Sequence, residues 1–329
     1  MPGIGSSLTA NISIMPDILF IKTSSLGDVI HHMPALTEAR AARPDARITW
    51  LVEEAFAPLA RLHPGVDAVI PLALRRWRKS LVSPATWTEI AAGWRGLRAA
   101  NYDLIVDTQG LGKTGVLSRI ARGTRHGYDR NSIKEPFASS FYDVRHTVSR
   151  GLHAVERNRI LTGLALGYAP QGAPDFGLDR ARFRGTEAPY VVLLHATAQP
   201  QKEWPVENWI ALGREIQRQG IEVVLPWGSV AERARSEQIA SALAGARVPE
   251  RMPLDQVARL IGGAHYVVGV DTGLLHLAAA LGVPLIAIFA GSKPELTRPV
   301  GSGPLTVLGA QGAPPAVDDA IAAFGKLRI

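Results

Sequence analysis

Two segments in the second half of the chain combine an apolar run, a polar loop and the expected start of a helix. The first, HATAQPQKEWPVENW (195–209), carries Lys202 in its loop. The second, VVGVDTGLLHLAAALG (267–282), has four candidate ligand-binding residues at or after the junction: Asp271, Thr272, Gly273 and His276. A helix that follows a strand directs free backbone N–H groups and the positive end of its dipole to one place, which suits an anion. Together the two segments predict a site for a diphosphate-linked ligand.

A third segment, KTSSLGDVIHHMPAL (22–36), follows the first apolar run and places Asp28 where a helix should begin. An aspartate in a first helical turn commonly accepts hydrogen bonds from free backbone N–H groups, and the residues alone favour that structural role. A carboxylate at the edge of a cleft is also a candidate general base.

The most basic stretch of the chain is ALRRWRKSLVSPATW (73–87), which contains four cations and a tryptophan within five residues. The cations are Arg75, Arg76, Arg78 and Lys79. Arginine binds carboxylates and phosphates through two parallel hydrogen bonds, so the stretch is a candidate site for an anionic substrate. A solvated basic loop or a patch that touches a membrane surface fits the same composition.

The composition narrows the possible classes of protein. A chain of 329 residues with 47% apolar residues is long enough for two domains, each with its own core. The formal net charge of +7 favours anionic partners, and because no nucleic-acid motif accompanies it, we expect phosphorylated substrates or acidic lipid instead. The absence of cysteine excludes disulfides and thiolate metal sites. No apolar run is long enough to cross a bilayer.

Apolar runs alternate with segments of helical periodicity through most of the chain. The runs are continuous rather than alternating, which is typical of parallel strands buried on both faces. We expect strands at 17–22, 47–52, 68–72, 102–108, 125–129, 190–196, 221–227, 266–271 and 284–290. A segment rich in Pro, Gly and charge at 168–189 is the expected linker. Strands alternating with helices predict an α/β protein with two doubly wound, Rossmann-like domains.

The expected domain boundaries follow from this pattern. Residues 1–15 lack the basic start and apolar stretch of a signal peptide and are expected to form a flexible extension. Residues 16–175 would form the first domain, 176–312 the second, and 313–329 a terminal helix. Two such domains facing a central cleft constitute the GT-B fold. A dehydrogenase-like or epimerase-like protein is disfavoured, because the first strand is not followed by a G-x-G-x-x-G motif.

The three motif segments resemble glycosyltransferase family 9, the heptosyltransferases, over residues 16 to 312. The resemblance is strongest to members that add the first heptose to Kdo in lipopolysaccharide core synthesis. It implies an inverting enzyme with Asp28 as general base and ADP-heptose as donor. The implied donor-binding residues are Thr197, Lys202, Glu232, Met252, Asp271, Thr272, Gly273 and His276. In this comparison Lys202 contacts the diphosphate, Glu232 the ribose and Met252 the adenine. Ala198 departs from the family, which often has a second hydroxyl there.

The resemblance also implies an acceptor and a location. Arg75, Arg76, Arg78 and Lys79 would bind Kdo carboxylates and lipid A phosphates of Kdo2-lipid A. No cofactor or metal is expected, because a lysine and helix N-termini would neutralise the departing ADP. The protein would be cytoplasmic and peripheral on the anionic inner-membrane surface.

Two alternatives stay open. One is a family member that acts on an already heptosylated core. The other is a non-catalytic nucleotide-sugar-binding protein whose basic face associates with membranes. A base opposite the donor-binding domain argues against the second, because donor binding alone does not require it.

Overall fold

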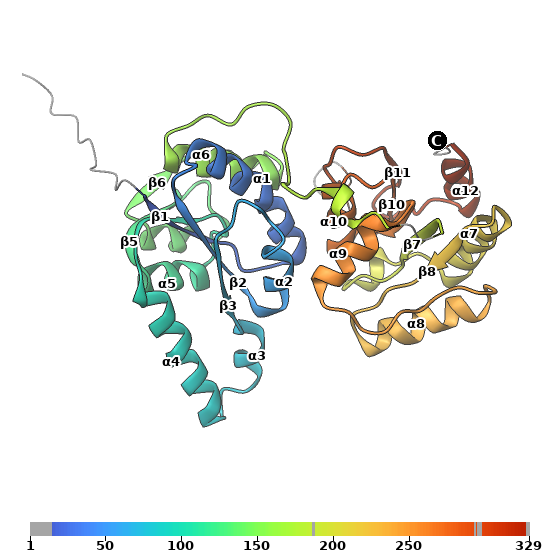
Figure 1. Cartoon of the computed structure of the whole chain (residues 1–329), viewed down its shortest axis with the longest axis horizontal. Helices are drawn as coiled ribbons and strands as arrows, with labels where there is room; N and C mark the ends of the chain where they lie inside the picture. The colour runs from blue at the N-terminus through green and yellow to red at the C-terminus, as the bar shows by residue number, and fades with distance from the viewer. Residues whose placement is uncertain (1–14, 186–187, 293, 295–297, 327–329) are drawn as a thin grey trace, which may run out of the picture.

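The computed structural model describes residues 15–185, 188–292, 294 and 298–326, which form two α/β domains, each built on a parallel sheet (Figure 1). The predicted extension therefore lies outside the described residues, except for Met15. The first sheet has the strand order β3-β2-β1-β4-β5-β6 and the second β11-β10-β9-β7-β8. Both are orders of doubly wound folds, in which the chain reverses direction across the sheet between β1 and β4 and between β7 and β9.

The first domain contains six strands and six α-helices among the described residues. Its strands are β1 (Asp17–Ile21), β2 (Arg47–Glu53), β3 (Ala68–Leu72), β4 (Asn101–Asp107), β5 (Arg122–Tyr128) and β6 (Val144–His146). Its helices are α1 (Leu26–Ala42), α2 (Ala57–Ala60), α3 (Leu74–Lys79), α4 (Pro84–Ala99), α5 (Gly112–Ile120) and α6 (Ala154–Leu166), with short 3-10 turns η1 (Glu54–Phe56) and η2 (Pro136–Phe141). The helices α3 and α4 project away from the sheet, at the bottom of Figure 1.

The second domain repeats this architecture with five strands. They are β7 (Tyr190–Leu194), β8 (Glu222–Val224), β9 (Tyr266–Val270), β10 (Leu285–Phe289) and β11 (Leu305–Gly309). The helices are α7 (Val206–Arg218), α8 (Val230–Ser241), α9 (Leu254–Gly263), α10 (Gly273–Ala280) and α12 (Val317–Lys326), and η4 (Pro200–Lys202) precedes α7. The helix α12 packs against α7 and so belongs to the second domain.

The strands β7, β9 and β10 form because they are apolar along their whole length and are covered on both faces. Every residue of β7, β9 and β10 is buried, as parallel strands between two helical layers require. The helices α7 and α9 each bury one apolar stripe; that of α7 includes Trp209, Leu212 and Ile216. The apolar residues of α1, α2, α9 and α10 form one continuous core that extends across the boundary between the domains. The two domains are therefore joined by apolar packing as well as by the chain.

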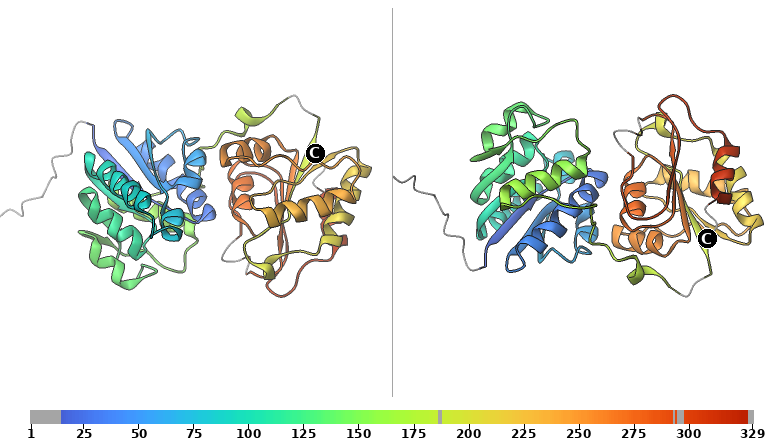
Figure 2. Two further views of the ribbon diagram at one scale, coloured as in Figure 1. Left: turned by 90° about the horizontal axis from the view of Figure 1, so that it is seen from below. Right: turned by 90° about the horizontal axis from the view of Figure 1, so that it is seen from above.

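The predicted strands and helices are found close to their expected bounds, with four omissions. The helices α2 and α3 and the strands β6 and β11 were not predicted. The predicted linker contains a 3-10 turn, η3 (Arg180–Phe183). Figure 2 shows the two domains from below and above, connected by this linker.

Two arginines attach the linker to the domains it connects. Arg159 of α6 donates from Nη2 to the carbonyl oxygens of Gln171 and Gly172, at 2.9 and 3.1 Å. Arg180 donates to the carbonyl oxygens of Gly262 and Ala264, at 3.0 and 2.7 Å. The first contact lies in the first domain and the second contact in the second domain, so each end of the linker is held.

A search of the helices among the described residues finds none that is both long enough and apolar enough to span a membrane.

Candidate functional site

The predicted motifs meet where the N-termini of α1 and α10 face each other. A Cβ added at Gly273, the first residue of α10, would lie 2.8 Å from Cβ of Leu26, the first residue of α1. A Cβ at Gly27 would lie 3.3 Å from the His276 ring. Only glycine permits the approach at Gly273. In doubly wound sheets, ligands bind at the carboxyl ends of the strands, at the point where the strand order reverses. The loops that follow β1 and β4 in the first sheet, and β7 and β9 in the second, lie at these points and converge here.

Asp28 lies in the first turn of α1, on the first-domain side of this junction. Its Oδ2 accepts hydrogen bonds from the backbone N–H of Ser25 at 2.7 Å and from the Ser25 hydroxyl at 3.1 Å. The side chain is half-buried. Asp28 therefore has the predicted capping contact, and that contact also fixes the orientation of a carboxylate that faces the second domain's helix.

A loop from the neighbouring strand supports Asp28, and the sequence analysis did not identify it. Gln109, after β4, accepts the backbone N–H groups of Thr23 and Ser24 through Oε1, both at 3.1 Å. Beneath the loop, Lys22 is buried and donates to the carbonyl oxygen of Thr108 at 2.9 Å; burial lowers its pKa. These contacts hold the backbone that presents Asp28.

Lys113 is a further residue that the sequence analysis missed. It lies in the first turn of α5, and its Nζ donates to the Ser24 hydroxyl at 3.0 Å. The pKa of Lys113 is lowered, and burial is the largest cause. The Lys113 amine also interacts electrostatically with Arg75, Arg78 and Asp28. This lysine therefore connects the Asp28 loop with the basic residues of α3. Its position in the GLGKTG loop after a predicted strand was the available signal.

Lys202 and Asp271 form an ion pair on the second-domain side of the junction. Nζ of Lys202 lies 2.7 Å from Oδ2 of Asp271, and the Ser292 hydroxyl donates to the same oxygen at 2.5 Å. Asp271 is buried, and Lys202 has 19% of its side chain exposed. Both residues were predicted to bind the donor, and here they also contact each other. Ser292 was not predicted.

The remaining predicted residues of this loop lie beside the pair. The Thr197 hydroxyl donates to the carbonyl oxygen of Asp271 at 3.3 Å. Thr272 is the N-cap of α10 and Gly273 is its first residue, so their N–H groups lie at the positive end of the helix dipole. Trp204 and Trp209 are fully buried, with ring centroids 5.1 Å apart, and pack α7 onto the sheet.

His276 connects the two domains. Its Nδ1 lies 3.1 Å from Nε2 of His31 on α1, and its Nε2 lies 3.9 Å from Oδ1 of Asp271. Burial lowers the pKa of His276 to about 4, despite the opposing effect of Asp271, and burial also lowers the pKa of His31. Both rings are therefore neutral at pH 7 and act as hydrogen-bonding groups, not as cations.

Glu232 and Met252 occupy the α8 and α9 side of the second domain. Oε2 of Glu232 accepts the backbone N–H groups of Gly228 and Ser229, at 2.7 and 3.2 Å, in a capping box at the start of α8. Arg235, on the same helix, donates to Glu203 at 2.8 Å and thereby ties α8 to the Lys202 loop. Met252 is half-buried against the apolar core. Their predicted contacts with a nucleoside stay predictions.

The basic segment forms the short helix α3, in which the four cations differ in environment. Arg76 forms ion pairs with Glu54 at 3.0 Å and Glu89 at 2.8 Å, and these two glutamates raise its pKa. The Arg75 guanidinium lies 5.0 Å from the centroid of the Phe56 ring. Arg78 and Lys79 are exposed. Arg78 and Lys79 are thus the cations most available to a substrate, whereas Arg76 stabilises the helix.

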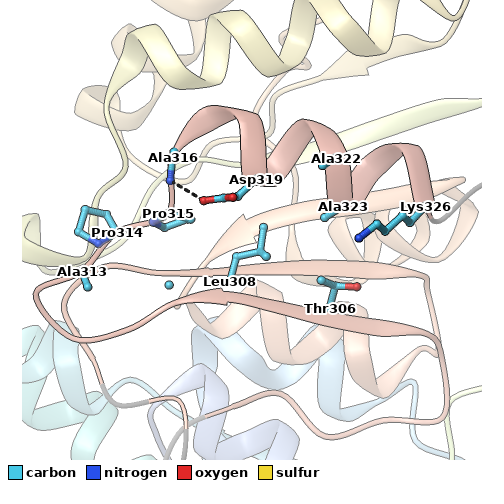
Figure 3. A pocket seen from close by; sticks show the side chains of 11 residues that line it. Thr306, Leu308, Ala313, Pro314, Pro315, Ala316, Asp319, Ala322, Ala323 and Lys326 are labelled. Atoms are coloured by element: carbon cyan, nitrogen blue, oxygen red, sulfur yellow. Dashed lines mark hydrogen bonds between the residues drawn. The ribbon is translucent and has the colours of Figure 1, made fainter.

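A hollow of ≈470 Å³ between β11 and α12 lies in a different part of the molecule (Figure 3). Small apolar residues make up most of its wall, and Asp319 accepts the backbone N–H of Ala316 at 3.1 Å. None of the predicted site residues lines it, so it is not the candidate site.

The part of the chain that the structure describes holds no group of three or more His, Asp or Glu side chains arranged to bind a metal ion.

The comparisons with known proteins agree with this geometry. The family model described as glycosyltransferase family 9 (heptosyltransferase) matches residues 90–319. Lipopolysaccharide heptosyltransferase 1 of Pseudomonas aeruginosa is 44% identical over 293 residues, which is 86% of this chain and 81% of that protein. The chain belongs to glycosyltransferase family 9.

Two solved structures support the fold as well as the family. The E. coli heptosyltransferase WaaC with ADP has a TM-score of 0.89 and 38% identity, covering 94% of this chain and 99% of that one. The same protein with ADP-2-deoxy-2-fluoro heptose has a TM-score of 0.83 and 40% identity, covering 94% and 98%. The fold is therefore GT-B, as predicted, and the protein is a glycosyltransferase of lipopolysaccharide core synthesis.

Proposed function

We propose that this protein transfers heptose from ADP-heptose to the Kdo of Kdo2-lipid A with inversion at the anomeric carbon. The observation that carries the proposal is the junction of α1 and α10, which places Asp28 of one domain opposite the N–H groups of Thr272 and Gly273 of the other. The relatives reported above, named heptosyltransferase 1 or solved with ADP and a fluorinated ADP-heptose, support this choice of donor.

The donor diphosphate binds at the start of α10, where free N–H groups and the helix dipole attract anions. Lys202 leaves Asp271 to contact the diphosphate, since a phosphate oxygen is an alternative partner for its amine. Asp271 then accepts hydrogen bonds from sugar hydroxyls. In the 2.7 Å pair the two charges compensate each other.

In the transfer step, the acceptor oxygen attacks the anomeric carbon from the side opposite the diphosphate. Asp28 takes the hydroxyl proton, and the bond to ADP breaks with its electron pair on the departing phosphate oxygen. Ser25 fixes the Asp28 carboxylate through two hydrogen bonds to Oδ2. Oδ1 is the oxygen that receives the proton.

Lys202 and the N-terminus of α10 stabilise the charge that develops on ADP, and no metal is needed for this step. We expect activity to persist in EDTA. A strict requirement for a divalent ion would contradict the metal-free mechanism.

The acceptor approaches from the side of α3 and α5. Arg78, Lys79 and Lys113 present cations that suit the carboxylates of Kdo and the phosphates of lipid A. The adjoining α3–α4 tip exposes Leu81 (48%), Val82 (98%), Trp87 (56%) and Trp94 (45%). Apolar and tryptophan side chains next to cations suit the interface of an anionic membrane, where the lipid acceptor resides.

The deciding experiment is a transfer assay with ADP-heptose and Kdo2-lipid A, run beside an acceptor that already bears the first heptose. We expect product with the first acceptor and little with the second. The reverse preference would indicate a member that extends a heptosylated core. ADP-heptose binding without turnover on either acceptor would indicate the non-catalytic alternative.

A further inference from the structure

A second pocket, of ≈440 Å³, lies where the two domains meet the linker. Its walls come from three parts of the chain: the segment that follows α2, the linker around η3, and the helix α9. Each part contributes one arginine, and these are Arg61, Arg182 and Arg259. The lining residues are different from those of the candidate glycosyltransferase site.

The pocket carries a net positive charge. Arg61, Arg182 and Arg259 are exposed, and among the described residues no carboxylate lies within 4.0 Å of their guanidinium groups. The wall includes Asp179, whose Oδ1 accepts the backbone N–H of Ala181 at 2.9 Å and so caps η3. Three guanidinium groups that share a pocket repel one another unless an anion lies between them.

The other lining groups add no competing charge. Burial lowers the pKa of His63 to about 4, so this ring is neutral at pH 7. Its Nε2 lies 3.1 Å from the carbonyl oxygen of Met33, and its Nδ1 accepts the backbone N–H of Gly65 at 3.1 Å. The Phe183 ring lies 5.6 Å below the Arg259 guanidinium, where it supports a planar cation.

We propose that this junction pocket binds a phosphate-bearing ligand. Arginine is the side chain best suited to hold phosphate, because its planar fork matches two phosphate oxygens. The volume falls within the range of small-molecule sites and exceeds the need of a bare phosphate, and Leu62 and Leu178 offer apolar wall. The ligand class is therefore an organic phosphate or diphosphate, either free or as a lipid headgroup.

Binding in the pocket would couple the two domains. Arg61 belongs to the first domain, whereas Arg259 belongs to the second and Arg182 to the linker turn that Arg180 fastens to the second. A ligand held by all three stabilises the arrangement in which they face one pocket, and it shifts the population toward that arrangement. The junction pocket is thus a second anion site, separate from the donor site.

The test titrates inorganic pyrophosphate into the full chain by isothermal calorimetry. Pyrophosphate also suits the donor site, so we expect two binding events in the unmodified protein. The double variant Arg182→Ala/Arg259→Ala should weaken one of the two pyrophosphate-binding events by about tenfold or more, because a charge-assisted contact is lost. Lys202→Ala should weaken the other. The control Arg214→Ala/Arg218→Ala removes the same charge from α7 and should change neither.

A second arm identifies the source of the phosphate, using sedimentation with phosphatidylglycerol vesicles. A loss of vesicle binding in the junction variant, but not in the α7 control, assigns the pocket to a lipid headgroup. A loss confined to the pyrophosphate titration assigns it to a free phosphate. If the double variant does not fold, the single variant Arg259→Lys provides the test. It keeps the positive charge but removes the planar guanidinium that pairs with two phosphate oxygens, so it should still weaken binding. Titrations and vesicle binding that match the unmodified protein overturn the proposal.

Discussion

Nε2 of His31 and Nδ1 of His276 lie 3.1 Å apart, although 245 positions separate them in the chain. The pair joins α1 of the first domain to α10 of the second, next to Gly27 and Gly273. His153 lies on the other side of His31, with ring centroids 5.1 Å apart. A contact between two uncharged rings thus holds the turn that carries Asp28 against the helix that begins the donor site.

The pair makes the stability of the protein dependent on pH. An unfolded histidine takes up a proton near pH 6.5, whereas folded His276 stays neutral to about pH 4. Unfolding therefore takes up protons in this window, and the free energy of unfolding falls as the pH drops from 6.5 toward 4. The lowered pKa of His276 accounts for a decrease of roughly 3 kcal/mol at most in the free energy of unfolding. His31→Asn/His276→Asn should show a shallower fall in Tm between pH 7.5 and 4.5. Equal pH dependence in both proteins would refute this role.

Replacement of Asp28 tests the proposed base. Asp28→Asn should lower kcat by about a hundredfold or more, since the proton acceptor is lost. The amide oxygen can still accept from Ser25, so the helix start and donor affinity should change little. The control Ser25→Ala removes the hydroxyl contact but keeps the carboxylate, and it should cost about 1 kcal/mol of stability while most activity is retained. Near-normal turnover in Asp28→Asn would remove this residue as the base.

Variants of the Lys202–Asp271 ion pair can distinguish a role of Lys202 in stability from a role in donor binding. Lys202→Ala should weaken ADP-heptose binding by about tenfold or more and lower Tm, because it leaves a buried carboxylate without its cation. Lys202→Met/Asp271→Asn removes both charges and should recover much of the Tm but not the affinity. Calorimetric binding and thermal unfolding of the two variants decide the matter. Recovered affinity in the double variant would show that Lys202 acts on the donor only through Asp271.

The helix α3 allows a matched pair of variants on one element. Arg78→Ala/Lys79→Ala should raise the acceptor KM and leave donor affinity unchanged, with a larger effect on more phosphorylated acceptors. The effect should shrink at high salt, because exposed charges are screened beyond about 8 Å at physiological ionic strength. Arg76→Ala should instead lower Tm, because Glu54 and Glu89 lose their partner. Kinetics on a deacylated, soluble acceptor exclude a membrane effect. An unchanged KM there would contradict acceptor binding by α3.

Most of the strands found by sequence analysis carry a continuous apolar run. The strand β9 is apolar throughout and was predicted to within one residue. The edge strand β11 alternates between exposed and half-buried residues, so it lacks the continuous apolar run. The strand β6 has three residues, of which Val144 and Arg145 are exposed, and α3 is dominated by charge. Pairing and packing with distant parts of the chain, which the local pattern does not contain, stabilise these three elements.

The residues of the candidate site also divide into those that a local motif reveals and those whose role depends on distant contacts. Asp28, Lys202 and Asp271 stand in local motifs and could be identified from their neighbours in the chain. Gln109 could not. Lys113 stands in a recognisable GLGKTG loop, but its role, like that of Gln109, arises only when the loop after β4 meets the loop after β1, 85 or more positions away. The pairing of Lys202 with Asp271 likewise depends on β7 and β9 being adjacent in the sheet.

The two arginines that anchor the linker fix the length of chain that can extend between the two domains. Arg159 holds the chain at Gly172 and Arg180 holds it again, which leaves residues 173–179 between the anchors. At roughly 3.5 Å per residue, these seven residues reach about 25 Å when fully extended. The domains can separate only within that radius while both anchors hold. The widest opening between the domains is therefore set by these seven residues and the two guanidinium groups.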